Sequence, residues 1–258
     1  MDWYLYIVVI IAGFVAGYIN TLAGSGSLVT LPLLIFLGLP PTVANGTNRV
    51  AILLQCAVAV GKFKSEKQLD IKNALILSIP AIIGAVIGAQ IAADLNETIM
   101  RQTIGILMVI MLAVILIRPK RWLEGRNDIS ESKPSWLRII VFFGIGLYGG
   151  FIQAGVGIFL LSGLVLGAGY NLVRANAAKN LIVLCFTVFA LAVFIYNDQV
   201  DWKIGLILAI GNMLGAWVAA KMAVKRGAGF VRWILIAVII ISALMLLGAE
   251  GYIQNIFN

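Results

Sequence analysis

The amino-acid sequence predicts an all-α polytopic membrane protein, built from two inverted-topology repeats with broken or re-entrant helices. Three observations lead to this fold class. Hydrophobic residues make up 62% of the 258 residues and charged residues only 12%, about half the charged share of an ordinary soluble domain. Long uncharged apolar runs recur along the chain and do not alternate as the strands of a β-barrel would. The two halves of the chain also match each other at a constant spacing.

Each half contains five apolar segments, which we expect to be helices. In the first half they are 5–22, 26–38, 43–61, 74–93 and 102–117. Segment 26–38 would be about 20 Å long as a helix, which is too short for a hydrocarbon core about 30 Å thick. We therefore expect this segment and its neighbour to be re-entrant or broken. Gly-x-x-x-Gly pairs at 84/88, 146/150 and 211/215 indicate close helix packing.

The repeat is visible when residues 23–26 (Ala-Gly-Ser-Gly) are laid over residues 154–157 (Ala-Gly-Val-Gly). The same alignment continues without a gap until Arg101 falls on Arg232. We predict membrane repeats at 1–118 and 137–258, joined by a cytoplasmic linker at 119–136.

Matching loops of the two halves carry opposite charge bias. Loop 62–72 is rich in lysine, whereas its partner carries Asp198, Asp201 and one lysine. Because cationic loops face the cytoplasm, matching loops lie on opposite sides, which is the mark of an inverted repeat. We predict that loops 62–72, 118–138 and 221–232 are cytoplasmic and that both termini are outside.

The stretch Gly24-Ser25-Gly26-Ser27 interrupts an apolar run. Backbone freed by such a break is tolerated only inside the protein or along a water-filled cavity. A helix that restarts near Ser27 would point its partly positive N-terminus at the break, which suits an anion. The second half has a corresponding break at Gly155-Val156-Gly157, without serines. A packing kink lined by small residues is the alternative interpretation.

Amide and cationic side chains begin the third segment of each half, at 44–49 and 174–180. Ionisable groups at membrane depth are usually functional, and arginine and lysine both suit oxyanions. Interfacial snorkelling is the alternative, most of all for Arg174. The predicted substrate-binding residues are Asn20, Gly24, Ser25, Gly26, Ser27, Asn45, Thr47, Asn48, Arg49, Gln153, Gly155, Gly157, Asn176, Lys179 and Asn180.

The residues that are missing narrow the function. The chain has no histidine, and its eleven acidic residues lie in loops or at segment ends. A buried proton relay or a Na⁺ site therefore lacks its usual groups, and we expect no metal, no cofactor and no enzymatic activity. A Ser25–Lys179 dyad is the one enzymatic alternative, because a serine–histidine pair is impossible. The net charge of +8 is explained by cytoplasmic loops, so nucleic acid is not an expected partner.

The stretch from Gly13 to Asn48, with Asn20, the break at 23–27 and Pro32, resembles the sulfite exporter TauE/SafE family of membrane transporters. The duplicated motifs at 154–157 and 175–180 fit the same pattern, and the resemblance covers nearly the whole chain. It implies a multi-pass plasma-membrane transporter of around eight spans that exports small sulfur-containing anions such as sulfite, sulfoacetate or related organosulfonates.

The expected partners are thus the lipid bilayer and a small anionic substrate. Transport of another small anion, or a scaffold role in a membrane assembly without transport, are the alternatives. The oligomeric state and the direction of transport stay open.

Overall fold

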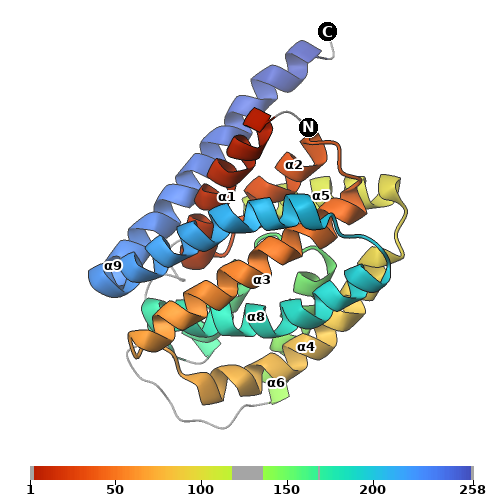
Figure 1. Ribbon diagram of the computed structural model, residues 1–258. Coiled ribbons are helices and arrows are strands. Elements are labelled where there is room, and N and C mark those ends of the chain that lie inside the picture. Colours follow the sequence, from red (N-terminus) through yellow and green to blue (C-terminus); the bar gives the residue numbers. More distant parts are fainter. Residues whose placement is uncertain (1–2, 118–135, 168, 257–258) are drawn as a thin grey trace.

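The computed structural model describes residues 3–117, 136–167 and 169–256, and these residues form helices with no strand (Figure 1). Apart from Trp136, the predicted linker at 119–136 lies outside the described residues. The first half contains α1 (Trp3–Ala23), α2 (Ser27–Phe36), α3 (Pro41–Ser65), α4 (Ile71–Ala93) and α5 (Glu97–Ile117). The second contains α6 (Trp136–Phe151), α7 (Val156–Ser162), a π-helical turn (Gly163–Gly167), α8 (Leu172–Tyr196) and α9 (Trp202–Ile256).

Five of the described helices are long and apolar enough to cross a membrane. They are α1, α3, α4, α8 and the Trp202–Gly227 part of α9. Helix α2 has only 10 residues, about 15 Å at 1.5 Å per residue, so it is too short to span. The all-α polytopic class is therefore confirmed, whereas the sidedness of the helices stays a prediction.

Local sequence signals explain where the helices begin and bend. Helix α3 begins directly after Pro40, with Pro41 in its first turn, where a missing backbone N–H costs nothing. Asp70 and Asn171 cap α4 and α8, each accepting a hydrogen bond from the backbone N–H three residues on. Gly227, with φ of 72°, breaks the regular backbone of α9.

The helix bounds of the two halves correspond when the halves are aligned as in the sequence, with residue 23 on residue 154. Under that alignment the first residue of α3, Pro41, falls on the first residue of α8, Leu172, and the last residues of these two helices also coincide. The first residues of α4 and α9 coincide as well. Left-handed backbone recurs at equivalent positions of the two halves, namely Gly24 and Gly155, Gly38 and Gly169, and Lys67 and Asp198.

The two halves interleave and share one core (Figure 1). Helices α3 and α8 pack on each other at the centre. Helix α9 packs on α1 and α3, while α4 packs on α6 and α8. The first helix of each half thus lies against the fourth helix of the other half. Each cluster of buried hydrophobic residues in the described part of the chain combines both halves, and the repeat boundaries given above stay a prediction.

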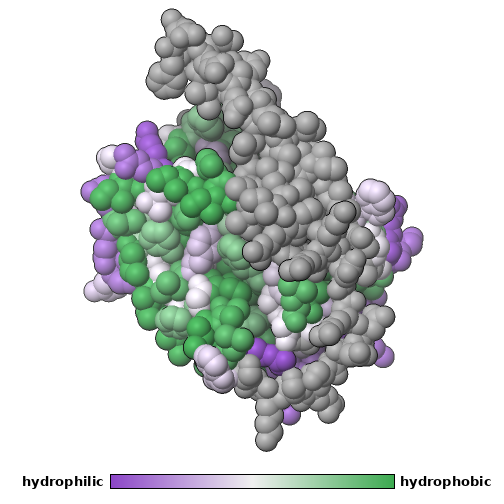
Figure 2. Space-filling model, turned by 180° about the vertical axis from the view of Figure 1, so that it is seen from behind, coloured by the Kyte–Doolittle hydropathy of each residue, from purple (hydrophilic) through white to green (hydrophobic). Residues whose placement is uncertain are grey.

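Glycines make these crossed contacts close. A Cβ on Gly84 or Gly88 of α4 would lie within 2.2 Å of backbone atoms of α6, and a Cβ on Gly211 or Gly215 of α9 would meet α1 in the same way. The Gly-x-x-x-Gly pairs therefore allow helix backbones to touch, as predicted. On the outside, Figure 2 shows hydrophobic residues gathered over the middle of one face and hydrophilic residues towards its rim, a surface suited to lipid.

Candidate functional site

The two predicted breaks meet at the centre of the protein. Helix α1 ends at Ala23, Gly24 adopts a left-handed backbone with φ of 79°, and α2 restarts at Ser27. The backbone N–H of Gly157 donates to the carbonyl of Gly24 across 3.2 Å. A Cβ on Gly24 would lie 2.3 Å from the Cα of Gly157, so this crossing accepts glycine alone.

Lys179 of α8 is buried beside the first break. Its ammonium donates to the carbonyls of Asn20 and Thr21, at 2.8 and 2.7 Å, and to Oδ1 of Asn176 at 2.9 Å. The two carbonyls belong to the last turn of α1, the end of the helix that carries partial negative charge. The carbonyl of Asn20 also accepts from the backbone N–H of Gly24, at 2.8 Å. An ammonium has three donors, so Lys179 uses all of them within the protein.

Arg49 of α3 occupies a similar place beside the second break, with its side chain fully buried. Its Nη1 donates to the carbonyl of Gly149 at 3.1 Å, and its Nη2 donates to the carbonyl of Gly150 at 2.5 Å. The guanidinium also lies over the ring of Phe194, 4.6 Å from its centroid. Each third helix therefore supplies a cation that caps the first helix of the other half.

Amide side chains hold the guanidinium in place. Oδ1 of Asn45 and Oε1 of Gln153 both accept from Arg49, each at 3.4 Å. Asn45 also donates to the carbonyl of Phe151, at 2.8 Å. Gln153, a non-glycine residue with φ of 53°, donates to Oγ1 of Thr187 at 2.8 Å. Gln153 thereby joins the second break to both α3 and α8.

The serine end of the first break is tied to α3 through Asn48. Asn48 donates to Oγ of Ser27 at 3.2 Å and accepts from Oγ1 of Thr30 at 2.7 Å. The hydroxyl of Ser25, by contrast, is buried without a hydrogen-bond partner in the protein. Other buried donors without a partner among the described residues are the hydroxyl of Thr21, Nε of Arg49, Nε2 of Gln55 and Nδ2 of Asn176. The region around the breaks thus retains unused hydrogen-bond donors, which normally cost stability.

A small cavity lies between these groups. Its volume is about 10 Å³, and its lining consists of Asn20, Cys56, Gln153, Val156, Gly157, Lys179, Asn180 and Val183. A space of this size holds one water molecule at most. The structure is therefore a closed form in which a larger anion has no room.

The predicted residues do not all gather there. Gly26 lies against α1, where a Cβ would be 2.2 Å from the carbonyl of Ala16. Gly155 packs against Met111. Oγ1 of Thr47 accepts from the backbone N–H of Asp201, at 2.8 Å, and so holds the start of α9. The hydroxyl of Thr47 thus serves the turn before α9, and the hydrogen bonds of the two buried cations go to other residues.

Sequence reasoning missed two amides that the structure adds to the cluster. Oε1 of Gln55 accepts from Asn20 and from Asn212, at 3.3 and 3.2 Å. Gln55 and Asn212 are both buried. Each is a polar residue in the middle of an apolar run, a signal that by itself marks a functional position in a membrane protein.

No acidic side chain neutralises either cation within the described part of the chain. The described acidic groups lie near the ends of helices instead, such as Glu66 and Asp94 after α3 and α4. Asp70, at the start of α4, accepts from the hydroxyl of Tyr170 at 3.1 Å. Burial raises the pKa of Asp70, but hydrogen bonds from Asn73 and Tyr170 outweigh it and hold that pKa below its ordinary value. Burial raises the pKa of Tyr170 to about 12. Among residues 3–117, 136–167 and 169–256, no group of three His, Cys, Asp or Glu residues could hold a metal ion.

Comparisons with known proteins agree with this architecture. The model of the family "Sulfite exporter TauE/SafE" matches residues 9–246. A "Probable membrane transporter protein ORF9" of Sinorhizobium sp is 27% identical over 247 residues, which cover 96% of this chain and 94% of that protein. The "Probable membrane transporter protein YfcA" of Escherichia coli K12 is 26% identical over 245 residues, covering 95% and 90%. No solved structure matches the chain.

Proposed function

This chain belongs to the sulfite exporter TauE/SafE family and is a membrane transporter of that type, and from this premise we propose that it exports small sulfur-containing anions across the plasma membrane. Sulfite, sulfoacetate and related organosulfonates are the proposed substrates. The family description supports the sulfur chemistry, and the charge of the buried site supports an anion.

The observation that carries the proposal is the pair of buried cations at the crossing of the two breaks. Arg49 and Lys179 are 0% and 2% exposed, and neither is ion-paired within the described residues. Removing a charge from water is costly unless an opposite charge compensates it. The C-terminal end of a whole helix supplies roughly half a unit of negative charge. A full negative charge on a bound anion would compensate the two cations better than the helix ends do.

The closed form suggests how binding and release are linked. We propose that separation of the two breaks enlarges the cavity between Asn20 and Gly157, and that an anion then replaces the helix-end carbonyls as the partner of Lys179. The spare donors on Ser25 and Asn176 would bind the remaining anionic oxygens. When the anion leaves, the ammonium returns to the end of α1, so that no empty state leaves it unpaired.

Gln153 gives the two cations a physical connection, because it lines the cavity and also accepts from Arg49. The lining contains no histidine and no acid that could relay a proton. Coupling to a proton gradient would therefore act through the protonation state of the substrate, or the protein is a uniporter.

The test is anion flux in liposomes that contain the purified protein, with sulfite, thiosulfate, a small organosulfonate, sulfate and chloride compared with and without a pH gradient. Saturable movement of one sulfur anion is expected. Arg49→Ala and Lys179→Ala should each reduce that flux by at least about tenfold, the loss that corresponds to roughly 1.4 kcal/mol.

Lys62→Ala is the matched control, since it removes a cation that already has an acidic partner at the surface. It should transport at the parental rate. If folded Arg49→Ala and Lys179→Ala proteins also kept that rate, the role of the buried cations would be lost. Selective flux of an anion without sulfur would replace the substrate class and leave the site in place.

A further inference from the structure

A second candidate site lies on the outer face of α9, away from the central crossing. Apolar side chains that are about half exposed recur there every three or four residues, at Trp202, Leu206, Ile210, Leu214 and Trp217. They form one stripe about 22 Å long at 1.5 Å per residue. A tryptophan stands at each end, as is typical where a helix meets the two membrane interfaces. The stripe is therefore a face that acyl chains contact.

The stripe runs directly into a basic pocket. The pocket has a volume of about 400 Å³ and is lined by Trp217, Val218, Lys221, Met222, Lys225 and Arg226. This volume lies within the range of pockets that hold small ligands. Lys221 lies over the Trp217 ring, 5.0 Å from its centroid, so cationic and apolar walls meet at one point. The hydroxyl of Tyr18 contacts Met222 from α1.

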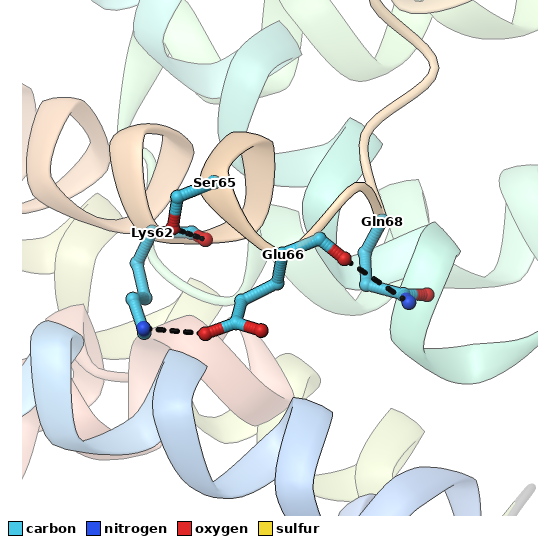
Figure 3. A network of polar contacts seen from close by, with 4 residues as sticks. All are labelled: Lys62, Ser65, Glu66 and Gln68. Carbon is cyan, nitrogen blue, oxygen red and sulfur yellow. Dashed lines mark hydrogen bonds and ion pairs between the residues drawn. The ribbon is translucent and has the colours of Figure 1, made fainter.

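A second basic cluster, formed by Lys62, Lys64 and Lys67 at the end of α3 and just after it, has an acidic partner that the pocket lacks among the described residues. At the end of α3, Lys62 pairs with Glu66, and side chains of Ser65 and Gln68 bond to the backbone of the same turn (Figure 3). Lys221, Lys225 and Arg226 form no ion pair with any described residue. Three cations without an acidic partner in the described part of the chain therefore line the space in which the apolar stripe ends.

We propose that this pocket binds the phosphate-bearing headgroup of an anionic phospholipid, with the acyl chains of that lipid along the α9 stripe. The positions of the groups match the parts of a lipid in order, with cations at the phosphate, Trp217 at the interface and aliphatic side chains along the tails. A basic segment at a membrane surface attracts anionic lipid by about 1 kcal/mol for each Lys or Arg. Free phosphate shares the charge but has no tails to use the stripe. The site is independent of the transport substrate proposed above.

The test is native mass spectrometry of the detergent-purified protein titrated with phosphatidylglycerol, with phosphatidylcholine as the neutral lipid. The variant Lys221→Gln/Lys225→Gln/Arg226→Gln should bind phosphatidylglycerol at least about tenfold more weakly, given the attraction per cation. The matched control is Lys62→Gln/Lys64→Gln/Lys67→Gln, which removes the same formal charge from the other cluster and should bind within about twofold of the parent. Binding of phosphatidylcholine should be equal in all three proteins.

Equal losses in the two triple variants would show that net charge alone attracts the lipid, and would overturn the site. Unchanged binding in the α9 variant would overturn it as well. Displacement of phosphatidylglycerol by an excess of inorganic phosphate would assign the pocket to free phosphate and refute the lipid. If the α9 triple variant does not fold, Lys225→Gln alone should still weaken binding by about fivefold, and parental binding by that single variant would count against the proposal.

Discussion

The contact between the two breaks can be tested by adding one methyl group at Gly157. A Cβ there would lie 2.3 Å from the Cα of Gly24 and 3.0 Å from its carbonyl oxygen. These are backbone atoms, which no rotamer change can move aside. Overpacking of this kind costs about 1–3 kcal/mol, while the higher helix propensity of alanine returns about 0.5–1 kcal/mol. We expect Gly157→Ala to destabilise the protein by about 1–2 kcal/mol.

Gly24→Ala should cost more, because two penalties add at that position. The new Cβ would meet Gly157 at 2.3 Å, and alanine would also have to adopt φ of 79°. Left-handed backbone costs a non-glycine residue about 1–2 kcal/mol. We therefore expect a loss of about 2–5 kcal/mol for Gly24→Ala.

Two other glycines separate these contributions. Gly38 has φ of 93°, and an added Cβ there would have nothing within 4 Å, so Gly38→Ala should show the backbone penalty alone. Gly61 lies inside α3 with neither feature, so Gly61→Ala should stabilise the helix by about 0.5–1 kcal/mol. Apparent melting temperatures in detergent, measured for all four variants, give the order. If Gly157→Ala melted as high as Gly61→Ala, the close crossing of the breaks would be refuted.

Three further predictions concern residues near the ends of the helices and the cavity. Thr47→Val should lower stability by about 1 kcal/mol, because it leaves the backbone N–H of Asp201 without its partner. The substrate concentration for half-maximal flux should not change. A changed value would place Thr47 at the binding site. Asp70 has a lowered pKa, so its charge stabilises the fold at pH values above the ordinary aspartate pKa near 4, and this contribution is lost as pH falls through the folded pKa. The difference in melting temperature between the parent and Asp70→Asn should therefore shrink below about pH 4. A constant difference would contradict the assignment. In a variant that lacks Cys185, Cys56 should react slowly with a charged thiol reagent, because the cavity that it lines is closed. An added substrate anion that opens the crossing should change the labelling rate. Labelling as fast as in denatured protein would exclude the closed form.

Much of the architecture could be predicted because it is local. The apolar runs give the helices, and α2 is short because its run is short. The break before Ser27 follows from Gly24, which adopts a left-handed backbone, and from Gly26, whose missing side chain allows close contact with α1. The constant spacing between the two halves is visible in the sequence and recurs in the helix bounds, since equivalent local sequences form equivalent helices.

The sequence also predicted which side chains would be costly to bury. It did not predict which residues those side chains contact. Arg49 and Lys179 were recognisable as cations at membrane depth. Their partners Gly149 and Thr21 lie far away along the chain, in the last turn of a first helix from the other half. No local pattern specifies such a pairing, because it depends on the interleaved packing of α1 on α9 and of α6 on α4.

The sequence by itself thus determined a helical membrane protein with two similar halves, two glycine breaks and an interior without acidic groups. Only the tertiary structure decided that the breaks touch, that each cation caps the other half's first helix, and that Gln55 joins Asn20 and Asn212 in one cluster. The physical reason is that helix-end carbonyls must find donors when no water is present. Which donor arrives is set by long-range packing between helices.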